Sequence, residues 1–221
     1  MNLQEAMQKR HSVRSYDKKP LQEDVLQKMQ MLIDCCNTEG NLHIQFVQNE
    51  PRAFSGIMAH YGKFSGVTNY LAMIGEKAPN LQEKCGYYGE KIVLAAQTWG
   101  LNTCWVALTY KKVKAAFEVC ANEKMMMVIA VGYGSNQGVV HAAKPLHKLG
   151  AITGDSPEWF CNGMKAAALA PTAMNQQKFY FSQKGNIVYA KAGMGFYTKT
   201  DLGIAKYHFE LGAGKENFQW G

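Results

Sequence analysis

The chain has 221 residues, a formal net charge of +7, 47% apolar residues and 19% charged residues. This is the balance of a globular protein that can bury a core without disulfides or a metal. Its basic residues are spread along the chain, which argues against a nucleic-acid-binding surface. Its six cysteines form no C-x-x-C pair, and it has no signal-peptide core and no apolar run of membrane length. We therefore expect a reduced, cytoplasmic protein with no membrane segment and no bound metal.

Hydrophobic periodicity predicts alternating helices and strands in the first two thirds of the chain. Acidic residues in the first turn and helical apolar spacing predict a helix over 21–36. The elements expected after it are a strand over 42–49, a short helix and loop over 52–64, a strand over 68–77, a helix over 82–100 ended by Gly100, a short segment over 102–108, a helix over 111–120, a buried strand over 123–134 and an irregular connector over 135–150.

The last third repeats this plan in shortened form. We expect a helix over 155–170, a hairpin over 177–192 that turns at Lys-Gly-Asn, and a helix over 200–214 capped by Thr200 and ended by Gly214.

The repeat appears in two pairs of segments. "CNTEGNLHIQF" (36–46) matches "APTAMNQQKFY" (170–180), and the helices 89–100 and 203–214 both carry glycines at their two ends. We interpret this as an internal duplication, with a core over 1–150 and a shortened copy over 151–221 that together form one site. The alternative is two unrelated helices with ordinary glycine stops.

The segment "RHSVRSY" offers groups that bind anions. Arginine forks donate paired, charge-assisted hydrogen bonds to phosphate oxygens. On an extended chain Arg10, Ser12 and Arg14 point to one side, and His11 and Val13 point to the other. The pattern favours an anion site, and the alternative is a solvated run of charges.

Two further segments could lie against a planar ring. "APTAMNQQ" (170–177) carries amides that both donate and accept, as the edge of a heterocycle requires. Its alternative is a loop after a helix, with Asn175 in a left-handed turn. "GLNTCWVAL" (100–108) offers small residues and backbone amides. Its alternative is a buried strand with Trp105 in the core.

Common catalytic motifs are absent from the sequence. The spacing Gly132-x-Gly134-x-x-x-Gly138 is not a dinucleotide fingerprint, and Pro145 would break a helix that followed it. There is no G-x-S-x-G, H-E-x-x-H or Walker loop, and the six histidines show no metal-binding spacing. We therefore assign no catalytic side chain and expect a cofactor to supply the chemistry.

Four segments together resemble the FMN-dependent nitroreductase family: "RHSVRSYDKKPL", "YYGEKIVLAAQTWGLNTCWVAL", "VGYGSNQGVVHAAKPLHKL" and "APTAMNQQKFYF". The resemblance covers nearly the whole chain. It implies an α+β fold with a mixed β-sheet sandwiched by helices, non-covalent FMN, and hydride taken from NADH or NADPH. Family members are usually homodimers with FMN at the subunit interface.

The resemblance also implies roles for individual residues. The phosphate and ribityl chain would be held by Arg10, His11, Ser12 and Arg14, with Lys144 as a late phosphate contact. One face of the flavin would be covered by Trp105, Val106, Ala107 and Leu108. The residues that normally come from the partner subunit would be Pro171, Thr172, Asn175 and Gln176.

The chain departs from the family pattern after its first long helix. Asn37 stands where proline is expected and Leu42 where a polar residue is expected, and Ala142 and Ala143 replace expected cations. The better copy of the asparagine segment comes late in the chain. This resembles the subgroup with a fused, shortened second copy, so we expect tandem pseudo-dimeric halves in a monomer that mimics a dimer, or in a homodimer.

The resulting hypothesis is a flavin oxidoreductase that acts on a small electron-poor acceptor such as a nitroaromatic or a quinone. Two alternatives come from other classes. One is a non-catalytic flavin-binding protein for storage or sensing, and the other is a basic adaptor for nucleic acid.

Overall fold

The computed structural model describes residues 1–221, which form two compact units. Unit 1 contains residues 1–8, 82–91 and 141–221, and unit 2 contains residues 9–81 and 92–140. The units do not follow the expected boundary at residue 150. Helix α4 (Leu81–Thr98) is divided between them, and the connector before residue 150 belongs to unit 1.

Unit 2 is built on a four-stranded sheet in the order β1-β2-β4-β3. The strands are β1 (Gln45–Val47), β2 (Asn69–Glu76), β3 (Asn102–Val106) and β4 (Glu123–Gly132). All three pairings are antiparallel, and a parallel bridge from Ser12 to Thr103 makes the sheet mixed at its β3 edge.

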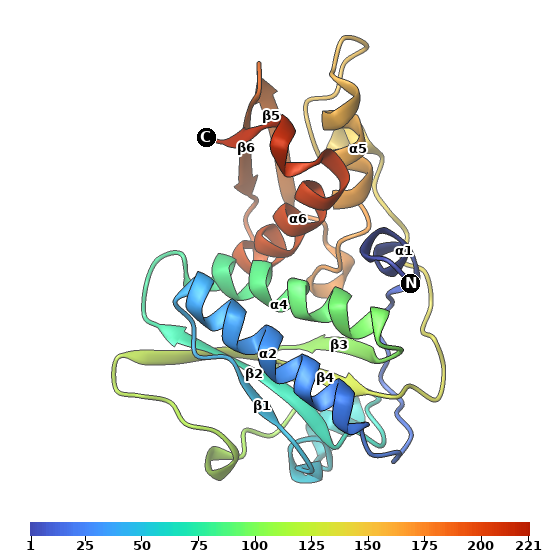
Figure 1. The fold of residues 1–221 in the computed structure, drawn as a ribbon, viewed down its shortest axis with the longest axis vertical. Coiled ribbons are helices and arrows are strands. Elements are labelled where there is room, and N and C mark those ends of the chain that lie inside the picture. The colour runs from blue at the N-terminus through green and yellow to red at the C-terminus, as the bar shows by residue number, and fades with distance from the viewer. The chain divides into compact units, whose positions relative to one another are not determined.

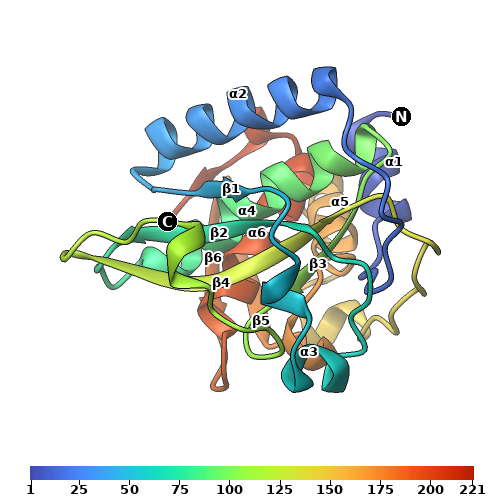
Figure 2. The ribbon, with the colours of Figure 1, turned by 90° about the horizontal axis from the view of Figure 1, so that it is seen from below.

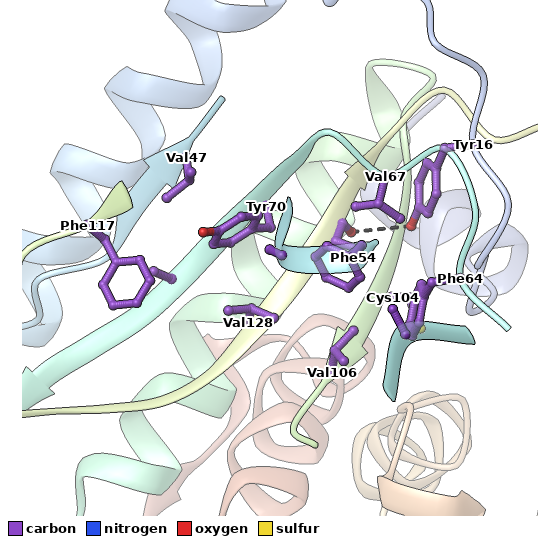
Figure 3. Packing of buried hydrophobic residues seen from close by; sticks show 14 of the residues in the cluster. Tyr16, Val47, Phe54, Phe64, Val67, Tyr70, Cys104, Val106, Phe117 and Val128 are labelled. Carbon is purple, nitrogen blue, oxygen red and sulfur yellow. Dashed lines mark hydrogen bonds between the residues drawn. The ribbon is translucent and has the colours of Figure 1, made fainter. Parts of the chain in front are cut away.

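The two faces of this sheet pack against different elements. Helix α2 (Glu23–Gly40) runs along one face (Figure 2) and buries Val25, Met29, Ile33 and Cys36, which recur at helical spacing. The opposite face carries alternate strand residues in one apolar cluster, shown in Figure 3. That cluster is closed by aromatic side chains from η1 (Pro51–Phe54) and from the segments around α3 (Ile57–Tyr61) and η2 (Lys114–Ala116).

One expected helix of unit 2 is wrong. Residues 111–120 form only the short 3-10 helix η2, and its C-cap Phe117 is extended, with φ −156°. Phe117 is buried in the apolar cluster, and Val113 and Ala116 pack against it. Their spacing looked helical in the sequence because all three contact the core, but they do so from an irregular segment.

Unit 1 combines helices with a three-stranded sheet. The helices are α1 (Leu3–Lys9), the first half of α4, α5 (Glu158–Ala167) and α6 (Thr198–Ala213), with the short η3 (Leu146–Lys148), η4 (Ala173–Asn175) and η5 (Lys215–Asn217). The expected hairpin is confirmed as β5 (Phe179–Lys184) and β6 (Ile187–Ala192), and β7 (Gln219–Trp220) pairs in parallel with β6.

The core of unit 1 is aromatic. Figure 1 shows α5 and α6 side by side beside the hairpin. Phe209 of α6 stacks on Phe181 at 5.0 Å between ring centroids and meets Phe160 of α5 edge-on at 5.6 Å. Gly163 of α5 lets the two helices approach, because a Cβ there would lie 2.6 Å from the Phe209 ring. The expected stop at Gly214 is confirmed as the C-cap of α6, but Thr200 lies inside that helix, and Tyr197 is its N-cap.

Helices α4 and α6 meet through a reciprocal contact within unit 1. A Cβ at Gly86 would overlap the carbonyl oxygen of Thr200, and a Cβ at Gly203 would overlap the carbonyl oxygen of Glu83. Position 86 therefore corresponds to 203 and position 83 to 200, with the same offset. Two helices that pack through facing glycines have this local two-fold geometry whether or not they are copies of one another. The contact pairs Gly203 with Gly86, three residues before the Gly89 that the sequence repeat matched to it.

The helices and two sheets confirm the α+β class expected from the sequence. No helix combines the length and the apolar character needed to cross a bilayer.

Candidate functional site

In unit 2 the segment 10–16 is an extended chain anchored by its backbone. Val13 donates its amide to Thr103 of β3, at 3.0 Å between nitrogen and oxygen. Tyr16 and Arg14 exchange backbone bonds with Ser65, each at 2.9 Å. Val13 is fully buried in the apolar cluster. Backbone groups and the buried side chains of Val13 and Tyr16 therefore fix the segment. The Arg14 side chain is exposed and is not needed for that purpose, whereas the Arg10 side chain is buried.

Three of the polar side chains act on the thiol of Cys104, one residue beyond Thr103 in β3. Burial raises the pKa of Cys104, and this rise is opposed by the positive charge of Arg14, by a hydrogen bond with Ser12 and by the charge of Arg10. The Arg14 guanidinium also lies 6.0 Å from the centroid of the Phe64 ring. Two arginines and one hydroxyl therefore act on the same thiol.

The loop after β4 comes close to the same segment. Gly138 has φ +69°, and a Cβ at this position would lie 2.8 Å from Cβ of His11 and 3.0 Å from the carbonyl oxygen of Ser12. The buried Asn102 fixes this loop, because its side chain accepts from the Gly134 amide at 3.0 Å and donates to Gln137 at 3.1 Å. A glycine at position 138 thus lets backbone approach His11 and Ser12 where any side chain would be in contact.

This arrangement fits an anionic group such as a phosphate. It provides guanidinium donors, a hydroxyl and a loop kept close by a glycine, all on a rigid sheet edge. No acid–base pair or nucleophile of a known catalytic type accompanies them here. The chemistry that it supports is binding and electrostatic attraction.

The segment expected to cover a flavin face, Trp105 to Leu108, leaves the end of β3. Val106 is buried in the apolar cluster (Figure 3), and Trp105 points to the opposite face of the sheet by strand alternation. Beyond the strand, Ala107 is half-buried and Leu108 is 66% exposed. The side chain of Val106 therefore serves the core.

In unit 1 the loop 170–177 is fixed mainly by its own side chains. The amide of Asn175 donates to the carbonyl of Ala142 at 2.9 Å, and Gln177 donates to the same carbonyl and to Asn175, both at 2.8 Å. Thr172 accepts from the backbone amide of Gln177 at 3.0 Å. These bonds hold Met174, Asn175 and Gln177 in left-handed backbone conformations, with φ of 52°, 52° and 43°.

Lys144 and Asp201 complete this loop. The Lys144 ammonium donates to the carbonyls of Gln176 and Gln177 at 2.7 and 3.3 Å. Asp201 in the first turn of α6 accepts from the Ala173 amide at 3.0 Å and from the Gln176 side chain at 2.7 Å. Burial raises the pKa of Asp201 to about 6, although both hydrogen bonds act in the opposite direction. The structure thus gathers Lys144, Thr172, Asn175 and Gln176 within unit 1.

Sequence reasoning missed several residues that shape these regions. They are Asn102, Cys104, Gly138, Gln177 and Asp201. Asp201 carried a weak signal as an acid in a first helical turn. Gln177 was visible as a polar neighbour of Asn175, but its burial and its three side-chain hydrogen bonds depend on the loop conformation.

Comparison with known proteins identifies a family for the whole chain. A family model described as "Putative TM nitroreductase" matches residues 2–213. No curated protein matches the chain. Among solved structures, a "putative nitroreductase" from Thermotoga maritima has a TM-score of 0.68 at 22% identity, covering 98% of this chain and 85% of that one.

Two shorter relatives cover less of this chain. A "nitroreductase-like protein" from Streptococcus mutans has a TM-score of 0.57 at 12% identity and covers 68% of this chain and 97% of its own. A "Putative NADH dehydrogenase/NAD(P)H nitroreductase" from Parabacteroides distasonis has a TM-score of 0.53 at 18% identity, with 71% and 99% covered. At these identities the likeness establishes the fold. The Thermotoga protein also matches the part of the chain that the shorter relatives lack.

Proposed function

Because the chain belongs to the nitroreductase family, we propose that it is an FMN-dependent oxidoreductase that passes hydride from NADH or NADPH to a small electron-poor acceptor such as a nitroaromatic or a quinone. The observation that carries the proposal is the anion-binding group of unit 2. The charges of Arg10 and Arg14 and a hydrogen bond of Ser12 all act on the Cys104 thiol, and Gly138 lets backbone come close to His11 and Ser12. These residues fit the phosphate of a flavin nucleotide.

Within this proposal, Arg10, His11, Ser12 and Arg14 bind the phosphate and the ribityl chain. The segment 105–108 covers one face of the ring, with Trp105, Ala107 and Leu108 as its accessible side chains and Val106 contributing only backbone. Bound FMN supplies the hydride chemistry, and the protein binds and orients it.

The residues of unit 1 have a different part in the proposal. Lys144 has three ammonium hydrogens and uses two of them on backbone carbonyls, so one can serve a phosphate oxygen. Pro171, Thr172, Asn175 and Gln176 are proposed as flavin contacts. Since the amides of Asn175 and Gln176 already donate to the protein, we expect them to act largely by shaping the backbone that meets the ligand.

The nicotinamide donor and the tandem architecture rest on separate observations. The Parabacteroides relative carries a name that includes NAD(P)H, which supports a nicotinamide donor here. The shorter relatives, which cover about two thirds of this chain, support a second copy of the fold that mimics a partner subunit. The reciprocal contact of Gly86 and Gly203 is compatible with this interpretation.

The experiment compares the binding of FMN and riboflavin, which lacks the phosphate. Arg14→Ala removes an exposed guanidinium, so the fold should be unaffected. We expect FMN affinity to fall roughly 10- to 100-fold, as for the loss of a charge-assisted hydrogen bond, and riboflavin affinity to change little. Lys124→Ala is the control, because it removes an exposed cation of the same unit on β4. Equal FMN affinity in both variants would contradict the assignment.

A further inference from the structure

A second chemically distinct cluster lies in unit 2, made by His43, Cys120 and Glu123. One ligand atom of each residue lies within 4.8 Å of the others. Nδ1 of His43 is 3.1 and 3.0 Å from the two carboxylate oxygens of Glu123. His43 precedes β1, Glu123 begins β4, and Cys120 lies in the turn before β4. No metal-binding motif is visible in the sequence, because His43 is far along the chain from the other two residues.

The cluster is held in place by backbone and by one glutamine. The His43 amide donates to the carbonyl of Ile74 at 2.8 Å. The Cys120 amide donates to the Glu123 carboxylate at 2.8 Å, and the Glu123 amide returns a bond to the Cys120 carbonyl at 3.0 Å. Gln45 of β1 then ties the turn down, because its side chain bonds the carbonyl and the amide of Glu118 at 2.7 and 2.9 Å. The ligand atoms are therefore preorganised.

We propose that His43, Cys120 and Glu123 bind a single zinc ion or a similar divalent transition metal. Imidazole, thiolate and carboxylate are the three ligand types that zinc takes in proteins, and three protein ligands leave a fourth position for water. The mixed nitrogen, sulfur and oxygen set disfavours calcium and magnesium, which prefer oxygen alone. The side chains of His43 and Glu123 are 36% and 11% exposed, which leaves an ion a route of entry.

A bound divalent cation would change the charge of this cluster, because a coordinating thiol loses its proton outright. Zinc binding should therefore release the Cys120 proton and cross-link the turn before β4 to the segment before β1.

A simpler interpretation explains two of the three residues. His43 and Glu123 could form an ordinary ion pair that ties the start of β4 to the neighbouring segment. That interpretation gives the Cys120 thiol only a hydrogen bond to the Glu123 carboxylate. The two accounts differ in what Cys120→Ser does to zinc affinity and in what zinc does to the reactivity of Cys120.

The chain contains a matched control for this thiol. Cys35 on α2 is also exposed, and its sulfur also lies beside a carboxylate, 3.1 Å from Oε1 of Glu39. No metal-binding group of three residues includes Cys35. Cys35→Ser therefore removes an equally placed thiol without touching the proposed site.

The test titrates zinc chloride into the full-length protein after metal has been removed with a chelator. We expect one zinc ion per chain, and we expect Cys120→Ser and His43→Gln each to weaken it more than the roughly 10- to 100-fold cost of losing an outer hydrogen-bond partner. Cys35→Ser should bind zinc as the wild type does. Because Cys120 is exposed, its serine variant should keep the thermal stability of the metal-free wild type.

A second measurement uses the thiols directly. Zinc should protect Cys120, but not Cys35, from alkylation by iodoacetamide, as read by peptide mass spectrometry. Equal protection of both cysteines, no zinc binding by the wild type, or unchanged zinc affinity in Cys120→Ser would overturn the proposal.

Discussion

In unit 2 the segment 10–16 is fixed to the sheet by backbone bonds, whereas in unit 1 the loop 170–177 is fixed largely by its side chains. Arg14 is exposed as a result, while the amides of Asn175 and Gln177 both donate to the carbonyl of Ala142. Both segments are rich in polar residues, and the sequence assigned both to the same ligand. Polar composition alone therefore does not separate a binding surface from a self-supporting loop.

The difference has a physical origin in the backbone. Left-handed conformations cost non-glycine residues roughly 1–2 kcal/mol each, so a loop with three of them needs internal support. An extended segment has no such cost and obtains its hydrogen bonds from neighbouring strands. Substitutions in unit 1 should consequently appear first in stability, and substitution of the exposed Arg14 should appear first in ligand affinity.

The largest expected effect tests the rigidity of unit 1. Gly86→Ala and Gly203→Ala each place a Cβ on a backbone carbonyl of the facing helix, so the helices must separate. Each should lower the free energy of unfolding by about 3 kcal/mol, at the upper end of ordinary overpacking. Gly154→Ala is the control, because nothing lies within 4 Å of its added Cβ. Urea unfolding measures all three variants.

If the contact is reciprocal, Gly86→Ala and Gly203→Ala should lower the free energy of unfolding by similar amounts. The double variant should lower it by less than the sum of the two single decreases. A large loss at one glycine with none at the other would remove the support for a two-fold relation.

The next effect is a pH-dependent contribution of Asp201 to the free energy of unfolding. Its pKa is raised from 3.8 to about 6 in the folded state, so the folded state binds the proton more tightly than the unfolded chain. Its contribution to stability is full below pH 4 and is lost as pH rises toward 6, by up to about 3 kcal/mol at 1.36 kcal/mol for each pKa unit. Asp201→Asn cannot titrate and should lack this loss.

Urea unfolding gives the free energy of unfolding of the wild type and of Asp201→Asn at pH 4 and at pH 7. The difference between the two proteins should change between these pH values by the contribution of Asp201. The exposed Asp155→Asn controls for removal of one carboxylate from unit 1. A difference that stays constant between the two pH values would show that Asp201 is not held in this environment.

The smallest effect separates two asparagines that share a backbone conformation. Asn41 has φ 47° at the C-cap of α2, and Asn175 has φ 52° in the loop of unit 1. Leucine should cost each site about 1 kcal/mol of left-handed strain. Asn175→Leu should cost roughly 1–2 kcal/mol more, because it also loses the bonds to Ala142 and Gln177.

Thermal unfolding measures the stability of both variants, and FMN titration measures their affinity. Only Asn175→Leu should weaken FMN binding. A greater loss of FMN affinity in Asn41→Leu would reverse the assignment of the two halves.

Helices and strands were predictable where the spacing of apolar residues matched only one type of secondary structure. Helix α2 followed from apolar residues at helical spacing, and the β5–β6 hairpin followed from two β-rich runs around Gly185. The segment 111–120 failed because its apolar residues contact the core from an irregular chain. Thr200 failed as a cap because α6 begins two residues earlier, at Thr198.

The candidate site was predictable only in part, for a related reason. The alternation of Arg10, Ser12 and Arg14 needs no information beyond an extended backbone. The role of Gln177 depends on a loop whose strain the sequence does not display. The cluster of His43 and Cys120 depends on strand pairing that brings distant segments together. The order of residues within a short segment predicts the geometry of that segment. Contacts between segments far apart in the sequence can be identified only once the fold is known.

The central claim is that this chain binds FMN and exchanges hydride through it. The most direct measurement is the visible spectrum of the FMN-loaded protein under anaerobic conditions, before and after addition of NADH or NADPH. We predict that the flavin absorbance is lost with at least one of the two nucleotides and returns when a nitroaromatic or a quinone is added. A protein that stays yellow with both nucleotides while keeping its FMN would contradict the claim and indicate a non-catalytic flavin-binding protein.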